Sequence, residues 1–122
     1  MSSQKKTLVL GASTNPARYS YKAIKMLQRF GHPVVAVGRK EEELDGVAIT
    51  KEQVGFENVD TVTLYLNPMN QKEYYDYIVS LNPDRVIFNP GTENPELYDL
   101  LKKNDIEIEV ACTLVMLSTN QF

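Results

Sequence analysis

The sequence contains one cysteine, Cys112, and one histidine, His32, among its 122 residues. A lone cysteine cannot form an internal disulfide, and these two residues give no cluster with the spacing of a zinc site. We therefore expect no disulfide framework and no structural metal, and no metal ligand is assigned.

The chain also lacks a surplus of positive charge and a long apolar run. Its net charge is −3, so no global field would gather nucleic acid or an anionic membrane. No run reaches the length of about 18 apolar residues that indicates a transmembrane helix, and residues 1–6 lack the apolar core of a signal peptide. We expect a cytoplasmic protein that binds neither nucleic acid nor membrane, and we leave a homodimer open.

What the sequence does contain is an alternation of strand-like and helix-like segments. With 43% hydrophobic and 24% charged residues, it has the composition of one globular domain, residues 1–122.

Ser20 is expected to cap the first helix and Asn94 a later one, which Pro95 opens. The stretch 41–60 is ambiguous, with a short apolar run at 47–49. Apolar spacing predicts strands at 7–11, 33–37, 61–66, 85–89 and 106–110, and helices at 21–30, 70–81, 95–101 and 112–117.

Strands joined by helices of this length run parallel with right-handed crossovers, and their helices cover both faces of the sheet. The sequence thus predicts an α/β fold: a single doubly wound Rossmann-like domain with a five-stranded parallel sheet of order 3-2-1-4-5. In that order the winding reverses between the first and fourth strands. A crevice is then expected at their carboxyl ends.

Two loops rich in glycine, proline and small polar residues border this crevice. GASTNPARYS, residues 11–20, follows the first strand, and NPGTEN, residues 89–94, follows the fourth. A strand that ends in such a loop before a helix is a common seat for phosphate on backbone N–H groups. The spacing differs from the dinucleotide fingerprint, because Ser13 and Pro16 stand where its second and third glycines would be. We interpret the loops as a ligand site, although ordinary turns use the same residues.

The turn after the second strand carries Arg39 and Lys40. In an NAD site an Asp or Glu takes the ribose hydroxyls near this point. Two cations instead favour a phosphate esterified to the ribose, which leaves NADP or coenzyme A with its 3′-phosphate. A solvated basic turn is the alternative.

Five segments together resemble the small stand-alone bacterial CoA-binding proteins, whose domain is similar to the N-terminal CoA-binding domain of the succinyl-CoA synthetase alpha subunit. The segments span nearly the whole chain: GASTNPARYSYKA, GHPVVAV, DTVTLYLNP, FNPGTENPE and ACTLVML. One departure is the turn 38–40, which reads Gly-Arg-Lys where the family often has an Asn-Pro-Lys-like turn.

The resemblance implies that the ligand is coenzyme A or an acyl-CoA. It implies that the pyrophosphate lies on the small-residue loop and the helix start, the adenosine end on the turn after the second strand, and the pantetheine arm on two later loops. The macrodipole of the first helix would add to the attraction for phosphate. The implied residues are, in that order, Gly11, Ala12, Ser13, Arg18 and Ser20; Arg39 and Lys40; and Asn67, Pro68, Pro90, Gly91, Thr92 and Glu93.

No catalytic residue is assigned. His32 falls in a turn away from the crevice, and Cys112 is expected to pack as a buried small hydrophobe, with a mixed disulfide to the CoA thiol as the alternative. The synthetase subunit carries its phosphorylated histidine in a second domain, for which these residues leave no room, so ligase chemistry is not implied.

We expect a non-catalytic module that binds coenzyme A or an acyl-CoA, with no reaction assigned. One alternative is an NADP-dependent oxidoreductase, which would need a donor group near the nicotinamide, and none is visible. The other is a regulatory protein with a vestigial nucleotide pocket.

Overall fold

The structure is a computed structural model that describes residues 4–122; residues 1–3, on which the signal-peptide expectation partly rests, lie outside the described residues. Within them, seven strands form one sheet in the order β3-β4-β2-β1-β5-β6-β7. The strands are β1 (Thr7–Ala12), β2 (Val34–Gly38), β3 (Glu42–Leu44), β4 (Val47–Thr50), β5 (Thr61–Leu64), β6 (Arg85–Phe88) and β7 (Glu107–Val110).

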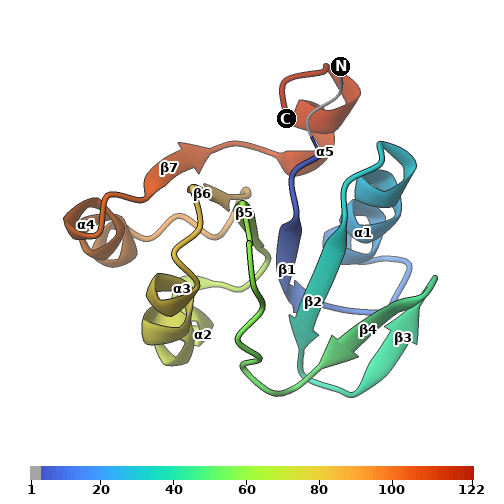
Figure 1. Ribbon diagram of the computed structural model, residues 1–122, viewed down its shortest axis with the longest axis horizontal. Coiled ribbons are helices and arrows are strands. Elements are labelled where there is room, and N and C mark those ends of the chain that lie inside the picture. The colour runs from blue at the N-terminus through green and yellow to red at the C-terminus, as the bar shows by residue number, and fades with distance from the viewer. Residues whose placement is uncertain (1–3) are drawn as a thin grey trace.

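The helices lie on both faces of this sheet (Figure 1). On one face are α1 (Tyr19–Arg29) and α5 (Thr113–Ser118); on the other are α2 (Pro68–Gln71), the 3-10 turn η1 (Lys72–Tyr74), α3 (Tyr75–Leu81) and α4 (Pro95–Lys103). All strand pairs are parallel except β3 with β4. The predicted α/β architecture, with a mostly parallel sheet covered on both faces, is confirmed.

The predicted strand number and strand order are wrong. The sheet contains a hairpin, β3 and β4, in the stretch that the sequence left ambiguous, and β4 pairs parallel with β2 through Ala36 and Ile49. The third predicted strand, which is β5, was expected beside β2, but β4 occupies that place. Strand β5 pairs instead with β1, on the side of β1 away from β2. The winding therefore reverses between β1 and β5, and not between the first and fourth predicted strands.

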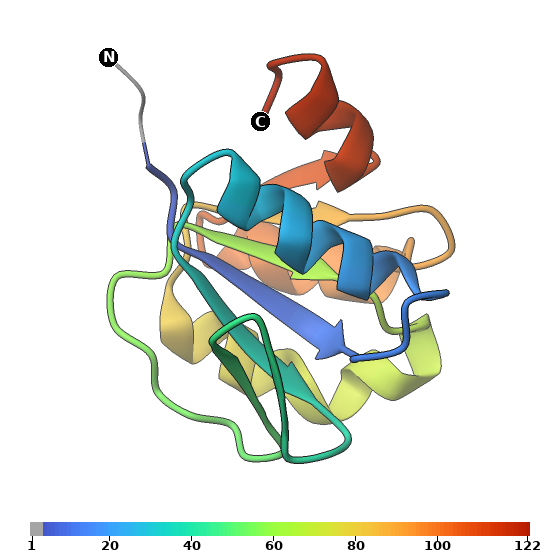
Figure 2. The same ribbon diagram turned by 90° about the vertical axis from the view of Figure 1, so that its right-hand side faces the viewer.

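The hairpin forms because Asp45 and Gly46 make its two-residue turn. Both have positive φ, 49° and 84°, which is the backbone conformation of a type I′ turn and fits the twist of paired strands. The Lys25 Nζ lies 2.6 Å from the Asp45 carboxylate and ties the turn to α1. Figure 2 shows the hairpin beside β2 at one edge of the sheet.

Alternating side chains of the central strands supply two cores. On β1, Leu8 and Leu10 face the α3 and α4 side, whereas Val9 faces α1 and α5. All four residues of β5 and all four of β6 are buried. Strands that are buried on both faces are the signature of a parallel sheet between helix layers, although β5 and β6 also bury the polar residues Thr61, Thr63 and Arg85.

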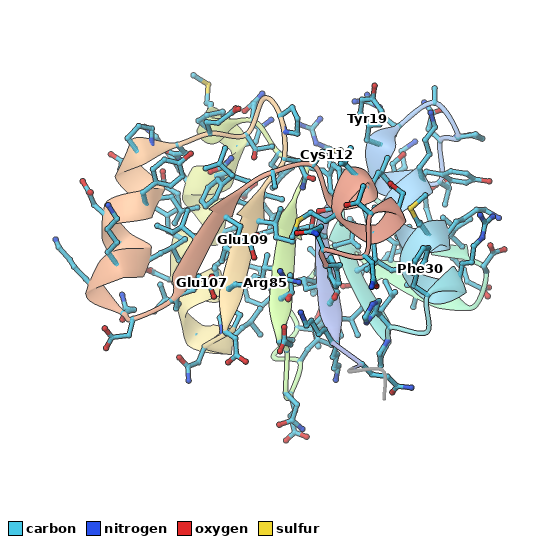
Figure 3. The ribbon with its side chains drawn as sticks, turned by 90° about the horizontal axis from the view of Figure 1, so that it is seen from above. Tyr19, Phe30, Arg85, Glu107, Glu109 and Cys112 are labelled. Atoms are coloured by element: carbon cyan, nitrogen blue, oxygen red, sulfur yellow. The ribbon has the colours of Figure 1, made fainter. Side chains whose placement is uncertain are left out.

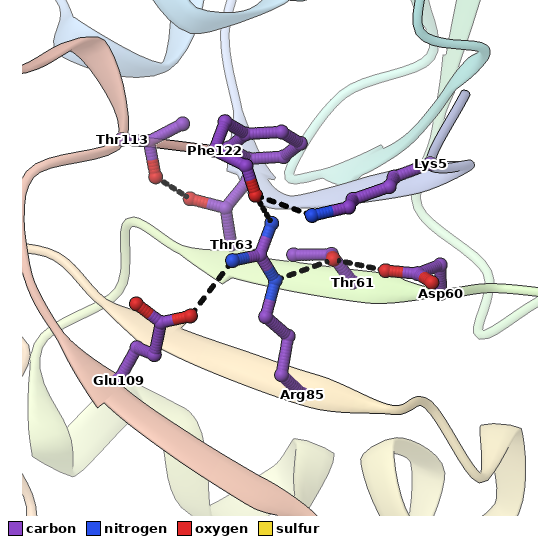
Figure 4. A network of polar contacts seen from close by, with 8 residues as sticks. All are labelled: Lys5, Asp60, Thr61, Thr63, Arg85, Glu109, Thr113 and Phe122. Atoms are coloured by element: carbon purple, nitrogen blue, oxygen red, sulfur yellow. Dashed lines mark hydrogen bonds and ion pairs between the residues drawn. The ribbon is translucent and has the colours of Figure 1, made fainter. Parts of the chain in front are cut away.

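A polar network closes the amino end of the sheet (Figure 4). The buried guanidinium of Arg85 donates to the Thr61 hydroxyl at 2.9 Å, to the Glu109 carboxylate at 2.7 Å and to the Phe122 carbonyl at 2.7 Å. The guanidinium also lies 4.5 Å from the centroid of the Phe122 ring. This network attaches the last residue to β5, β6 and β7.

Figure 3 shows both ends of the sheet, seen from the face that carries α1 and α5. Cys112 and Tyr19 lie toward the carboxyl ends of the strands, whereas Arg85 and Phe30 lie toward the amino ends. The loops that the sequence singled out belong to the carboxyl end.

Candidate functional site

A cleft of about 950 Å³ lies at the carboxyl ends of β1, β2, β5 and β6. It opens where the winding reverses, which is where open α/β sheets bind ligands. Its walls come from the loop after β1, the first turn of α1, the turn after β2, the segment after β5 and the loop after β6. Of the residues predicted for the site, it brings together Gly11, Ala12, Ser13, Arg18, Ser20, Arg39, Lys40, Asn67, Pro90, Gly91 and Thr92.

Two predicted residues, Pro68 and Glu93, are not in the lining of the cleft. Pro68 opens α2 directly after Asn67. The Glu93 carboxylate accepts a hydrogen bond of 2.8 Å from the N–H of Gly91. Pro68 therefore contributes to the start of α2, and Glu93 to the shape of the loop after β6.

Strand β1 is irregular at Gly11, where its register with β2 shifts between Leu10 and Ala12. Gly11 has φ +96°, and a Cβ on it would lie 3.1 Å from the Leu66 side chain and from the Tyr65 carbonyl carbon. Such a φ favours glycine, and the segment after β5 leaves little space for a side chain. These two constraints give a direct reason for glycine at this position.

The first turn of α1 faces the cleft without a capping side chain. The helix begins at Tyr19 with Arg18 at the N-cap, and within residues 4–122 no side chain caps it. The prediction that Ser20 is the cap is wrong: Ser20 lies inside the first turn and is buried. Uncapped N–H groups and the positive end of the macrodipole favour an anion here.

The charged side chains of the lining favour an anion as well. Arg18, Arg39 and Lys40 line the cleft together with Glu42 and Glu73, so the cleft is more positive than a chain of net charge −3. The Glu42 carboxylate accepts a hydrogen bond of 2.6 Å from the Thr14 hydroxyl, which ties the loop after β1 to β3.

Several residues of the lining were not assigned individually from the sequence, although Thr14, Asn15, Ala17 and Tyr19 lie in the predicted loop 11–20. The lining also contains Thr14, Asn15, Ala17, Tyr19, Gly38, Glu42, Tyr65, Leu66, Asn70, Glu73 and Tyr74. Behind it, the buried amide of Asn89 donates to the Thr63 hydroxyl at 2.7 Å and accepts from the Thr113 N–H at 2.9 Å. Asn89 belongs to the predicted loop 89–94, but its burial and its partners follow only from the fold, in which a buried polar group needs hydrogen bonds.

Cys112 and His32 lie outside the lining of the cleft. Cys112 is half-buried at the N-cap of α5, so the expectation of a buried thiol is wrong. His32 is at the amino end, where its Nδ1 accepts a hydrogen bond of 3.0 Å from the Lys5 N–H and its ring centroid lies 4.9 Å from that of Phe122.

Residues 4–122 show neither a cluster of metal ligands nor a membrane-spanning helix. Nowhere in that range do three or more His, Cys, Asp or Glu side chains gather closely enough to hold a metal ion. Each helix there is also too short or too polar to cross a membrane.

The fold defines a Rossmann-like α/β domain, with a cleft at the reversal of winding. Residues 5–118 match the family described as the CoA binding domain. The chain belongs to this CoA-binding domain family. No curated protein matches it significantly.

Solved structures share the fold. A crystal structure of an uncharacterized protein is 53% identical, with a TM-score of 0.96 over 99% of this chain and 100% of that one. A Thermus thermophilus protein is 24% identical, with a TM-score of 0.85 over 98% and 91%. A dinucleotide-forming acetyl-coenzyme A synthetase of Ca. Korarchaeum cryptofilum, 16% identical, has a TM-score of 0.70 over 85% of this chain and 25% of that one, which shows the fold alone.

Proposed function

We propose that the protein binds coenzyme A or an acyl-CoA in this cleft as a non-catalytic module. Membership of the CoA-binding domain family supports the ligand class. The observation that carries the proposal is that residues from four separate loops, matched to three parts of CoA by resemblance, line one cleft at the reversal of winding.

Each part of the ligand is matched to residues with suitable chemistry. The first turn of α1 and the loop 11–13 offer backbone N–H groups and a helix dipole to the pyrophosphate. Arg39 and Lys40 offer charge to the 3′-phosphate. Asn67 and the loop 90–92 form the opposite wall, where small and polar groups suit the amides of the pantetheine arm.

The test is a calorimetric titration of the pure protein with CoA, acetyl-CoA and NADP. We expect CoA to bind at least about tenfold more tightly than NADP, because Arg39 and Lys40 would serve either phosphate, whereas the resemblance matches the wall at 90–92 to the pantetheine arm, which NADP lacks. Tighter binding of NADP would favour the oxidoreductase. Absence of binding for all three ligands would favour a vestigial pocket. The ratio of CoA to acetyl-CoA affinity decides whether the acyl group is recognised.

A further inference from the structure

Gln71, the last residue of α2, is fully buried behind the cleft. Its Nε2 donates to the carbonyl of Leu66 at 2.8 Å and to the carbonyl of Thr92 at 2.9 Å. Its Oε1 accepts a bond of 2.9 Å from the amide of Asn94. Both donors of the glutamine amide are thus used on main-chain oxygens.

The two carbonyls belong to two neighbouring segments of the cleft wall. Leu66 follows β5, Thr92 follows β6, and both line the cleft. The ladder between these strands ends at the pair Leu64 and Phe88. Directly beyond it, the amide of Asn89 donates to the Leu64 carbonyl at 2.8 Å, and farther along the two segments the amide of Gln71 joins Leu66 to Thr92.

The partner of Gln71 is itself fixed on two sides. The Asn94 amide also donates to the Tyr75 hydroxyl at 2.8 Å, and its Oδ1 caps α4 by accepting from the Leu97 N–H at 3.4 Å. The bridge therefore connects the two loops to α3 and α4, which pack on the sheet.

We propose that Gln71 is a positioning residue that sets the spacing between Leu66 and Thr92 and hence the shape of the wall that receives the pantetheine arm. The proposal rests on the proposed function for the identity of that ligand part. Gln71→Leu would leave two buried carbonyls without a donor, and Gln71→Glu would place a carboxylate against them; each loses the bridge.

The bridge itself is tested in the ligand-free protein by hydrogen exchange. The matched control is Thr61→Val, which removes a buried hydroxyl that accepts from Arg85 Nε at the amino end of β5. We expect Gln71→Leu to accelerate exchange in segments 65–67 and 89–94, and Thr61→Val to leave these segments unchanged. Unaltered exchange in both segments of a folded Gln71→Leu protein would overturn the positioning role, whatever the ligand.

The functional consequence is tested by titrating CoA and adenosine 3′,5′-bisphosphate, which lacks the pantetheine arm. We expect Gln71→Leu to weaken CoA about tenfold, while adenosine 3′,5′-bisphosphate changes by less than about twofold and Thr61→Val changes neither. Equal losses for both ligands would mean general damage and would overturn the proposal. Failure of the unmodified protein to bind CoA would instead refute the proposed function, and the exchange experiment would still decide on the bridge.

Discussion

Gly38, the last residue of β2, lies against the carbonyl oxygen of Ala12, the last residue of β1, so closely that a Cβ on Gly38 would overlap that oxygen. The two residues are partners in the β1–β2 register, and both line the cleft. The absence of a side chain on one strand end therefore sets how near the other can come.

Gly38→Ala should separate the ends of β1 and β2. We expect a loss of about 1–3 kcal/mol in the free energy of unfolding, because the clash is with backbone and cannot be relieved by a rotamer change, together with weaker CoA binding. Gly55→Ala is the control, since a Cβ at that position meets nothing within 4 Å. Urea unfolding and calorimetry of both variants check this, and equal behaviour of the two would contradict the steric explanation.

Arg39 and Lys40 should recognise the 3′-phosphate of CoA. Hydrogen bonds to a charged partner contribute about 1.5–3 kcal/mol, so we expect CoA to bind about 10- to 100-fold more tightly than dephospho-CoA. The double change to alanine should lower CoA affinity to the dephospho-CoA level and leave dephospho-CoA almost unaffected. The paired cations Lys102 and Lys103, in the last turn of α4, are the control. Equal losses for both ligands would remove Arg39 and Lys40 from the 3′-phosphate.

His32 should make the stability fall at acid pH. Burial, assisted by the charges of Lys5 and Arg85 and opposed by Asp60, lowers the pKa of His32 from 6.5. The unfolded chain then takes up the proton first, so the free energy of unfolding falls as the pH drops through 6.5 and levels off below the folded pKa.

The check is urea unfolding at about pH 7 and about pH 5, on either side of the ordinary histidine pKa. His32→Asn keeps an acceptor for the Lys5 N–H without the titrating ring, and we expect a smaller difference between the two pH values in this variant. The same difference in both proteins would show that other groups control the acid response.

Cys112→Ser should be tolerated. Cys112 has the extended backbone of an N-cap residue, φ −97° and ψ 117°, and a serine hydroxyl there can accept from the Val115 N–H. We expect stability to change by less than about 1 kcal/mol, in the stabilising direction, with Cys112→Ala less stable than the serine variant. CoA affinity should not change. A reductant-sensitive adduct of CoA mass that the serine variant lacks would instead make the thiol a ligand contact.

The architecture was readable from the sequence because apolar periodicity reports which faces are buried. Five of the six parallel strands, β1, β2, β5, β6 and β7, and the helices on both faces follow from it directly. Strand order does not, because it depends on which neighbour occupies the place beside β2. The signal for that neighbour was present: Asp45-Gly46 lies between Leu44 and Val47, a typical two-residue hairpin turn.

The candidate site was partly readable for a similar reason. Loop residues such as Gly11 and Arg39 stand at strand ends, and the ends of parallel strands meet at one edge whatever the order of the strands. Glu42 and Tyr74 could not be assigned, because their place in the lining depends on the hairpin and on the η1 turn. Gln71 lies within an apolar helical pattern, and only the three-dimensional structure reveals the two carbonyls that it joins.

The most direct measurement is a titration of the isotope-labelled protein with CoA followed by amide chemical shifts. We expect the largest changes in the segments 11–20, 38–40 and 90–92, which surround the cleft, and none at His32 or Arg85 at the opposite end of the sheet. Changes concentrated at the amino end, or spectra that CoA leaves unaltered, would contradict binding of CoA in this cleft.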